Sequence, residues 1–346
     1  MSNEIILTTQ RALKRLRQTF FSGCLVVSAI AFGSGSAQAQ ELKPVTIVLP
    51  GSSAMAWYPI VVAKEQGYFA EQGLDVSIQS VDGSGAVLQA MAAGRAEFGA
   101  PGPGPVLNAA ARGGDIKFFY NLFARGLFML AGDENDGITS AEQLRGKQIG
   151  VSTADGAEVS FTRNALASVG LQMGDYKFVT IGQEGMAVTA FDRDTIAAFA
   201  ASFTGIAVLK DRGVKVFDLT PPGFQLFGNG LAVRGEIYRE SPGLVAGFAK
   251  AVHKATLWGM ENRAGVLKAG ESFNPQEVER AEYAKTLLDS VIKQYQPLEG
   301  NKLGYLPDAG WQAWQHSQVS TGEMEAPLKD LSGVYTNEFV ENLGDK

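Results

Sequence analysis

The chain has 346 residues, of which 45% are hydrophobic and 19% are charged, a balance typical of a folded protein with a substantial core. Residues 40–346 carry 26 basic and 35 acidic side chains, a net charge of −9, with no cluster of Lys or Arg. This balance argues against a nucleic-acid-binding protein, because such proteins present a basic face.

The first 39 residues are typical of an export signal. Four basic residues, at 11, 14, 15 and 17, precede a short apolar stretch at 20–32, and a segment of small residues ends in Ala37-Gln38-Ala39. This order of a basic, an apolar and a small-residue region is that of a secretory signal, and we predict cleavage after Ala39. The only cysteine, Cys24, lies within the signal, so the exported part can form neither a disulfide nor a thiolate metal site.

The first third of the exported part alternates between β and α patterns. Strands are predicted at 45–49, 74–81, 97–99 and 116–123, with helices at 59–66 and helices ending at Ala93 and Arg112. This alternation predicts βαβ units and a mainly parallel sheet.

The second third repeats this pattern. Residues 75–119 and 176–217 share the order strand, Gly-containing turn, Ala-rich helix, short strand, Gly loop, helix and strand. Between and after them, strands are predicted at 128–131, 148–151 and 231–234, and helices at 140–144, 242–261, 275–295 and 307–321. We therefore predict two lobes of one architecture, the first from residues 41–125 plus 232–346 and the second from residues 126–231.

Six glycine-containing or small-residue loops follow the predicted strands, at 51–58, 82–85, 101–105, 152–156, 182–185 and 202–205. Ligands of α/β sheets bind at the carboxyl ends of the strands. Most of these loops open a helix, whose unpaired N–H groups could receive an anion. Gly83, Gly85, Gly102 and Gly104 would let a ligand approach the backbone closely. Taken singly, each loop is better explained as an ordinary βα turn, and it is the convergence of six loops on one face that favours a ligand site.

Several segments resemble one family of binding proteins. They are AWYPIVVAKEQGYFAEQGLDV at 56–76, GSGAVLQAMAAGRAEFG at 83–99, GKQIGVS at 146–152 and NGLAVRGEIYRESPGLVAGF at 229–248. In this order they resemble the sulfonate, nitrate and thiamine-precursor binding proteins, also called SsuA/THI5-like or NMT1-like. The resemblance implies an α/β type II periplasmic-binding fold, with two lobes of mixed, mainly parallel sheets flanked by helices and a cleft between them. It also implies a monomer in the periplasm that serves an ABC permease.

The resemblance places ligand-binding residues in four of the loops: Ser53 and Trp57, Ser84 and Gly85, Gly102 and Pro103, and Thr153 and Asp155. The residue types add Tyr58, Glu184, Ser202 and Phe203 to this set. Trp57, Tyr58 and Phe203 could sandwich a flat ligand, although Tyr58 is equally suited to a core position. Asp155 is also suited to capping a helix, and Arg125 could either pair with a carboxylate or lie in solvent. The family often has an acidic residue near 195–198 and a proline near 202–204, and their absence here predicts a more apolar cleft wall.

We predict a binding protein that captures a small organic anion, of the sulfonate or aromatic carboxylate type, by hinge closure. A thiamine-pyrimidine precursor is the alternative ligand. An enzyme is less well supported, because no Ser/His/Asp constellation, metal motif or nucleotide motif occurs. A pyrimidine-synthase-like enzyme would need a histidine in the cleft, and the only histidines, His253 and His316, lie far in sequence from the loops. We predict no metal and no cofactor.

Overall fold

The computed structural model describes residues 41–182, 185–222, 224 and 226–344. The predicted export signal and the predicted ligand residue Glu184 lie outside the described residues. In the described part of the chain, no helix is both long and apolar enough to cross a bilayer.

The first of two five-stranded sheets has the strand order β2-β1-β3-β10-β4. Its strands are β1 (Lys43–Pro50), β2 (Leu74–Val81), β3 (Phe98–Gly99), β4 (Ile116–Asn121) and β10 (Gly230–Arg234). Strand β1 pairs in parallel with β2 and β3, whereas β10 runs antiparallel between β3 and β4. Alternate side chains of β1 enter different cores, Ile47 on one face and Val48 on the other, so the sheet is buried on both faces.

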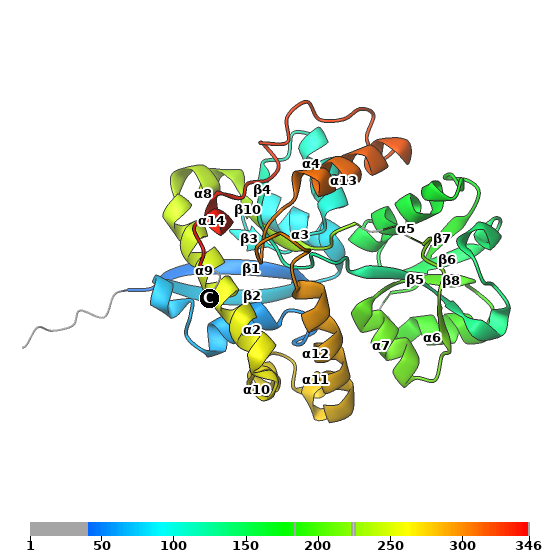
Figure 1. Ribbon diagram of the computed structural model, residues 1–346, viewed down its shortest axis with the longest axis horizontal. Coiled ribbons are helices and arrows are strands. Elements are labelled where there is room, and N and C mark those ends of the chain that lie inside the picture. Colours follow the sequence, from blue (N-terminus) through cyan, green and yellow to red (C-terminus); the bar gives the residue numbers. More distant parts are fainter. Residues whose placement is uncertain (1–40, 183–184, 223, 225, 345–346) are drawn as a thin grey trace, which may run out of the picture. The chain divides into compact units, whose positions relative to one another are not determined.

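The second sheet repeats this arrangement, with the order β7-β6-β8-β5-β9. Its strands are β5 (Phe128–Asp133), β6 (Gln148–Val151), β7 (Lys177–Thr180), β8 (Ala198–Ser202) and β9 (Val216–Asp218). Here β5 takes the antiparallel position that β10 takes in the first sheet. Strand β10 follows the whole second sheet in the chain and returns to complete the first, and Figure 1 shows the second sheet in green.

Helices cover both faces of the first sheet (Figure 1). One face packs against α2 (Tyr58–Glu65), α9 (Pro242–Glu261), α10 (Arg263–Phe273) and α12 (Ala281–Tyr295). The other packs against α3 (Gly83–Ala92), α4 (Pro103–Ala111) and α13 (Asp308–Ser320). The first core is rich in aromatic rings, and Phe98 of β3 stacks on Phe248 of α9 with ring centroids 4.1 Å apart.

Helices also flank the second sheet. Helix α5 (Ala157–Ser168) packs on one face through Leu166, and α6 (Gly185–Asp192) and α7 (Phe203–Asp211) pack on the other through Phe191 and Leu209. The remaining helices are short: η1 (Ala70–Gln72), η2 (Glu134–Asp136), η3 (Ala141–Leu144), α8 (Gly235–Glu240), α11 (Pro275–Glu279) and α14 (Glu338–Glu341).

The two sheets, their mixed pairing and their flanking helices confirm the predicted α/β fold class. The C-terminal region differs in detail from the prediction. The helix predicted at 275–295 is divided into α11 and α12, because Arg280 has a non-helical ψ of 67°. Helix α10 was not predicted, and it is separated from α9 by Asn262, whose ψ of 59° is also non-helical.

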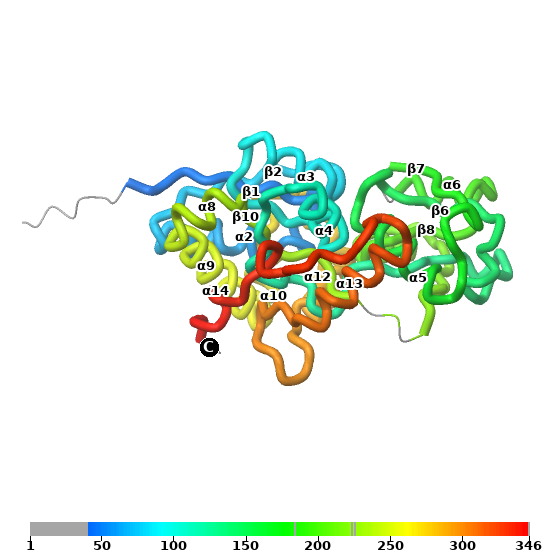
Figure 2. The backbone as a smooth tube through the Cα atoms, turned by 90° about the horizontal axis from the view of Figure 1, so that it is seen from above, coloured from blue at the N-terminus to red at the C-terminus, as the bar shows by residue number. Residues whose placement is uncertain are grey.

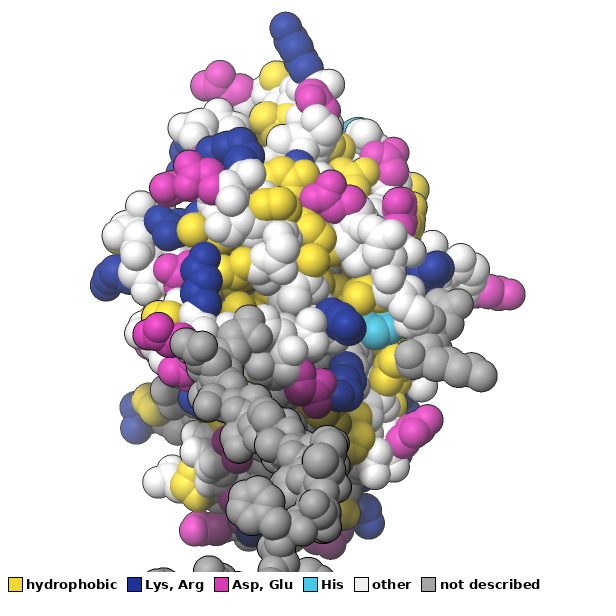
Figure 3. Space-filling model, turned by 90° about the vertical axis from the view of Figure 1, so that its left-hand side faces the viewer, with side chains coloured by type: hydrophobic (Ala, Val, Ile, Leu, Met, Phe, Trp, Pro, Cys, Tyr) yellow, Lys and Arg dark blue, Asp and Glu magenta, His cyan; other side chains and the backbone are white. Residues whose placement is uncertain are grey.

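The C-terminal segment returns to the first sheet (Figure 2). The N–H of Phe118 in β4 donates to the Val334 carbonyl, and the N–H of Thr336 donates to the Phe118 carbonyl. This pairing satisfies the outer edge of β4. On the face shown in Figure 3, basic and acidic side chains are interspersed, and the described residues there form no basic patch.

Candidate functional site

A cavity of about 360 Å³ lies among loops from both sheets. Its wall includes residues that follow β1, β2, β6 and β8, together with residues from the crossing between β4 and β5. Loops after the carboxyl ends of parallel strands are where α/β proteins bind ligands. Six of the predicted ligand residues line it: Ser53, Trp57, Ser84, Thr153, Ser202 and Phe203.

Aromatic rings form much of the wall. Trp57 meets Phe123 edge to face with ring centroids 5.4 Å apart, and Phe123 in turn lies 5.5 Å from Phe203. Phe128 and Tyr283 complete the aromatic lining. Rings arranged in this way give a wall suited to a flat ligand.

The loop before α2 is held by α11. The Ser53 hydroxyl donates to Glu277 Oε1 over 2.6 Å, and the N–H of Met55 donates to Glu277 Oε2 over 2.9 Å. Burial raises the pKa of the Glu277 carboxyl, and the hydrogen bonds from Ser53 and Met55 oppose this effect. Because this acid lies 224 residues from Ser53, no local signal in the sequence connects the two.

Three backbone donors in the predicted anion loops are engaged within the protein, whereas the starts of α3 and α5 have no side-chain cap. The N–H of Gly102 donates to Ser84 Oγ over 3.0 Å, and that of Gly205 donates to Ser202 Oγ over 3.1 Å. The N–H of Thr153 donates to Glu158 Oε1 over 2.9 Å. These three N–H groups, near the starts of α4, α7 and α5, are therefore not available to a ligand in this structure.

Glycines near the cavity bring the two sheets' loops together. A Cβ at Gly102 would lie 2.4 Å from the Cβ of Ala157, and one at Gly104 would lie 2.9 Å from that of Ser160. At Gly83, whose φ is +77°, a Cβ would lie 2.6 Å from the Thr153 hydroxyl oxygen. We expected these glycines to make room for a ligand, but the space that they leave is filled by the loop before α5 and by α5 itself.

Hydrogen bonds join the same two regions beyond the glycines. Arg163 of α5 forms an ion pair with Glu323 over 2.6 Å, and Glu323 also accepts from the Ser160 hydroxyl over 3.3 Å. The Asn164 amide donates to Gln318 of α13 over 3.2 Å. Helix α5 packs on the second sheet and α13 on the first, so these bonds connect elements of both sheets.

Five predicted ligand residues lie outside the cavity lining. Tyr58 is fully buried in the first core, where its hydroxyl donates to the Thr256 carbonyl over 3.0 Å. Gly85 and Asp155 line a second groove of about 780 Å³ instead. Gly102 and Pro103 are buried where the loops meet.

Arg125, which we considered as a partner for a carboxylate, does not line the cavity either. It is exposed and donates to the Pro297 carbonyl over 3.1 Å.

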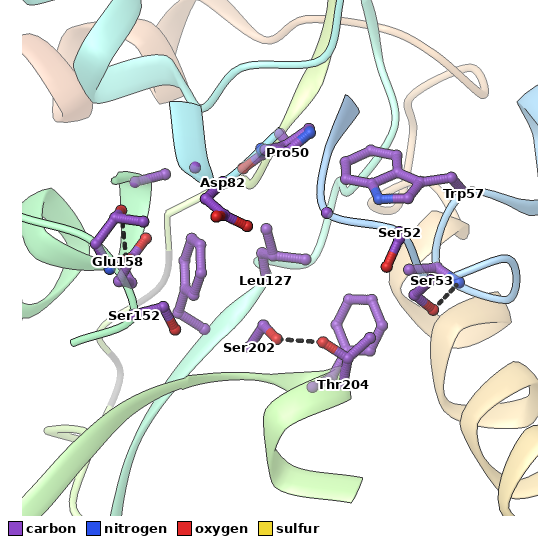
Figure 4. Close-up of a pocket in the computed structure, with 18 of the residues that line it drawn as sticks. Pro50, Ser52, Ser53, Trp57, Asp82, Leu127, Ser152, Glu158, Ser202 and Thr204 are labelled. Atoms are coloured by element: carbon purple, nitrogen blue, oxygen red, sulfur yellow. Dashed lines mark hydrogen bonds between the residues drawn. The ribbon is translucent and has the colours of Figure 1, made fainter. Parts of the chain in front are cut away.

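The charged lining is acidic. Asp82, Glu158 and Glu277 line the cavity, and among the described lining residues there is no Lys, Arg or His. Figure 4 shows Trp57 at one end of the cavity, Glu158 at the other and Asp82 between them. We did not single out these acids from the sequence, although Asp82 opens a loop that we did consider.

Asn229 adds an amide at the cavity wall. Its Nδ2 donates to the Ala100 carbonyl over 2.9 Å, and the residue has a relative exposure of 2%. Its Oδ1 is buried without a hydrogen-bond partner.

Neither histidine of the chain lines the cavity. His253 is buried beside Tyr120, whose hydroxyl lies 3.2 Å from its Nδ1, and His316 is exposed. In the described part of the chain, no group of three or more His, Cys, Asp or Glu side chains could hold a metal ion. The geometry therefore offers shape, aromatic surface and hydrogen-bond acceptors rather than a histidine base.

Comparison with known proteins agrees with this fold. The riboflavin-binding protein RibY of Chloroflexus aurantiacus is 25% identical over 310 residues, which cover 86% of each chain. A Bacillus subtilis protein whose name assigns it provisionally to aliphatic sulfonates is 26% identical over 299 residues, 80% of this chain and 83% of that protein. The alkanesulfonate-binding protein SsuA of Xanthomonas axonopodis, solved with MOPS bound, has a TM-score of 0.67 at 17% identity over 86% of this chain and 99% of that one. The model of the NMT1/THI5-like family matches residues 55–264, more than half of the chain. The chain therefore belongs to the NMT1/THI5-like family.

Proposed function

We propose that this protein is the solute-binding component of an ABC-type importer, not an enzyme, and that the 360 Å³ cavity holds its ligand. The observation that carries the proposal is that loops from both sheets line this one cavity. A ligand inside would contact both parts of the protein at once. Such a ligand favours the closed arrangement, because its contacts with both parts exist only when they are together.

The names of the relatives support a binding role. RibY and the Bacillus subtilis protein are named for the small molecules riboflavin and aliphatic sulfonates. We propose that the chain is exported by residues 1–39, acts as a monomer in the periplasm and delivers its ligand to a permease. The proposed moving parts are residues 41–125 plus 232–346 and residues 126–231.

The ligand class expected from the sequence, a small organic anion, stays a prediction, and the acidic lining bears on its charge. An anion in the cavity would face carboxylates without a compensating cation among the described residues. A thiamine-pyrimidine precursor, the alternative ligand, does not meet this difficulty. We therefore propose a small organic ligand.

A thermal-shift screen of the purified exported protein tests the proposal, because a bound ligand raises the melting temperature by mass action. The screen would include sulfonates, aromatic acids, pyrimidines and riboflavin. Thr204 lines the cavity, and Thr204→Trp would fill part of it, whereas Thr195 is exposed outside it, so that Thr195→Trp is a matched control. We expect at least one compound to raise the melting temperature of the wild type and of Thr195→Trp but not of Thr204→Trp. A shift that survives in Thr204→Trp would place binding elsewhere and contradict the proposal.

A further inference from the structure

We infer that the cavity selects a flat ring system that carries N–H donors and no negative charge. This inference rests on the proposed function and specifies its ligand. It depends on the charge of the lining, the state of the backbone donors, the aromatic wall and an unpaired buried acceptor.

The charge of the lining favours a neutral or cationic ligand. Glu158 and Glu277 accept hydrogen bonds from the protein, whereas Asp82 is exposed at the start of α3 and makes no hydrogen bond or ion pair with any described residue. Like charges within about 4–6 Å disfavour each other, and opposite charges at that distance attract. An amidine or amino group could pair with the free carboxylate, but a carboxylate or sulfonate could not.

The backbone donors offset this acidity only in part. Anion sites in α/β proteins usually depend on free N–H groups at helix starts. Here the N–H groups of Gly102, Thr153 and Gly205 already donate to side chains of the protein. An anionic ligand could use the N–H groups at the start of α3, which no side chain caps, but it would meet the Asp82 carboxylate that precedes that helix.

The remaining lining adds an unpaired acceptor and aromatic side chains. Asn229 Oδ1 is a buried acceptor without a partner, and such groups are costly unless a donor reaches them. The rings of Trp57, Phe123 and Phe203 lie in contact along one wall. Rings of this kind stack on flat ligands and attract a cationic one most strongly.

A series of naphthalene probes tests the inference, because it changes charge while keeping one flat body. The probes are 2-naphthamidine, 2-naphthamide, 2-naphthoate and naphthalene-2-sulfonate, titrated by calorimetry into the exported protein. We expect the amidine to bind about tenfold or more tightly than the carboxylate and the sulfonate, with the amide between them. Tighter binding of either anion would overturn the inference while leaving the proposed function intact, provided that Thr204→Trp abolishes that binding.

The Asp82→Asn variant identifies the carboxylate responsible, and Asp75→Asn, an exposed acid on β2 outside the lining, is its matched control. We expect Asp82→Asn to weaken amidine binding about fivefold or more and to change amide binding little. Equal amidine affinities in wild type and Asp82→Asn would contradict the role of Asp82. If none of the four probes binds the wild type and the screen described above also finds no ligand, both the inference and the proposed function fail.

Discussion

Substituting Gly102 by Ala tests whether the loops of the two sheets must come together for binding. Gly102 precedes α4 and has φ −80° and ψ 157°, an extended conformation that alanine adopts freely. The new methyl group would therefore act through crowding and not through backbone strain. Its closest neighbour would be the Cβ of Ala157, at 2.4 Å, on the first residue of α5.

The size of the effect follows from this distance. Carbon atoms pack at about 3.5–4.0 Å, so the start of α4 and the start of α5 must separate by roughly 1 Å or more. Overpacking of this kind typically costs about 1–3 kcal/mol. If residues 41–125 plus 232–346 can move apart from residues 126–231, this overpacking free energy destabilises the closed form alone. The closed population, and with it the ligand affinity, should then fall about 5- to 150-fold.

Calorimetry with a confirmed ligand and small-angle scattering would measure both consequences. The control is Gly243→Ala on α9, where a Cβ would meet no atom within 4 Å. We expect Gly102→Ala to weaken binding and to enlarge the radius of gyration of the liganded protein, with little change in the melting temperature of the free protein. A normal affinity together with a large fall in melting temperature would show that Gly102 lies in a fixed core and that the loops need not separate.

The other predictions concern Trp57 and Glu277, which line the cavity, and Tyr58, which lies in the first core. Trp57→Ala should weaken ligand binding by more than about 1 kcal/mol and also lower the melting temperature, because Trp57 both lines the cavity and packs on Phe123. An unchanged affinity by calorimetry would show that Trp57 does not contact the ligand. Tyr58→Phe should cost about 1 kcal/mol of unfolding free energy in urea titrations and leave affinity unchanged, because only a core hydrogen bond to Thr256 is lost; weakened binding would contradict this. Burial raises the pKa of the Glu277 carboxyl above its ordinary value of 4.5. The stability that Glu277 contributes is therefore greatest below pH 4.5 and falls as the pH rises through the higher pKa of the folded state. Melting curves should show that the wild type loses stability relative to Glu277→Gln above pH 4.5, and parallel curves for the two proteins would contradict this.

The fold was largely predictable because its signals are local. The β-branched run at β1 and the breaker at Pro50-Gly51 give the strand and its end, and the repeated order of elements predicts a second sheet like the first. The break between α11 and α12 was not predictable in this way. Helical periodicity continues through Arg280, and only the backbone geometry reveals the interruption.

The site was predictable to the level of loops but not of side chains. The loops after β1, β2, β6 and β8 do meet at one cavity, and Ser53 and Thr153, which the family resemblance indicated, line it. What the glycines do could not be predicted, because the sequence does not say whether a ligand or Ala157 occupies the space beside Gly102. Glu277 was missed because its role depends on a contact across 224 residues.

We expect the ligand to occupy the cavity between the loops of the two sheets. A crystal structure of the exported protein with the tightest-binding compound tests this claim most directly. We predict ligand density beside Trp57, in contact with residues that follow strands of both sheets. Density in the groove lined by Gly85 and Asp155, with the cavity empty, would contradict the account.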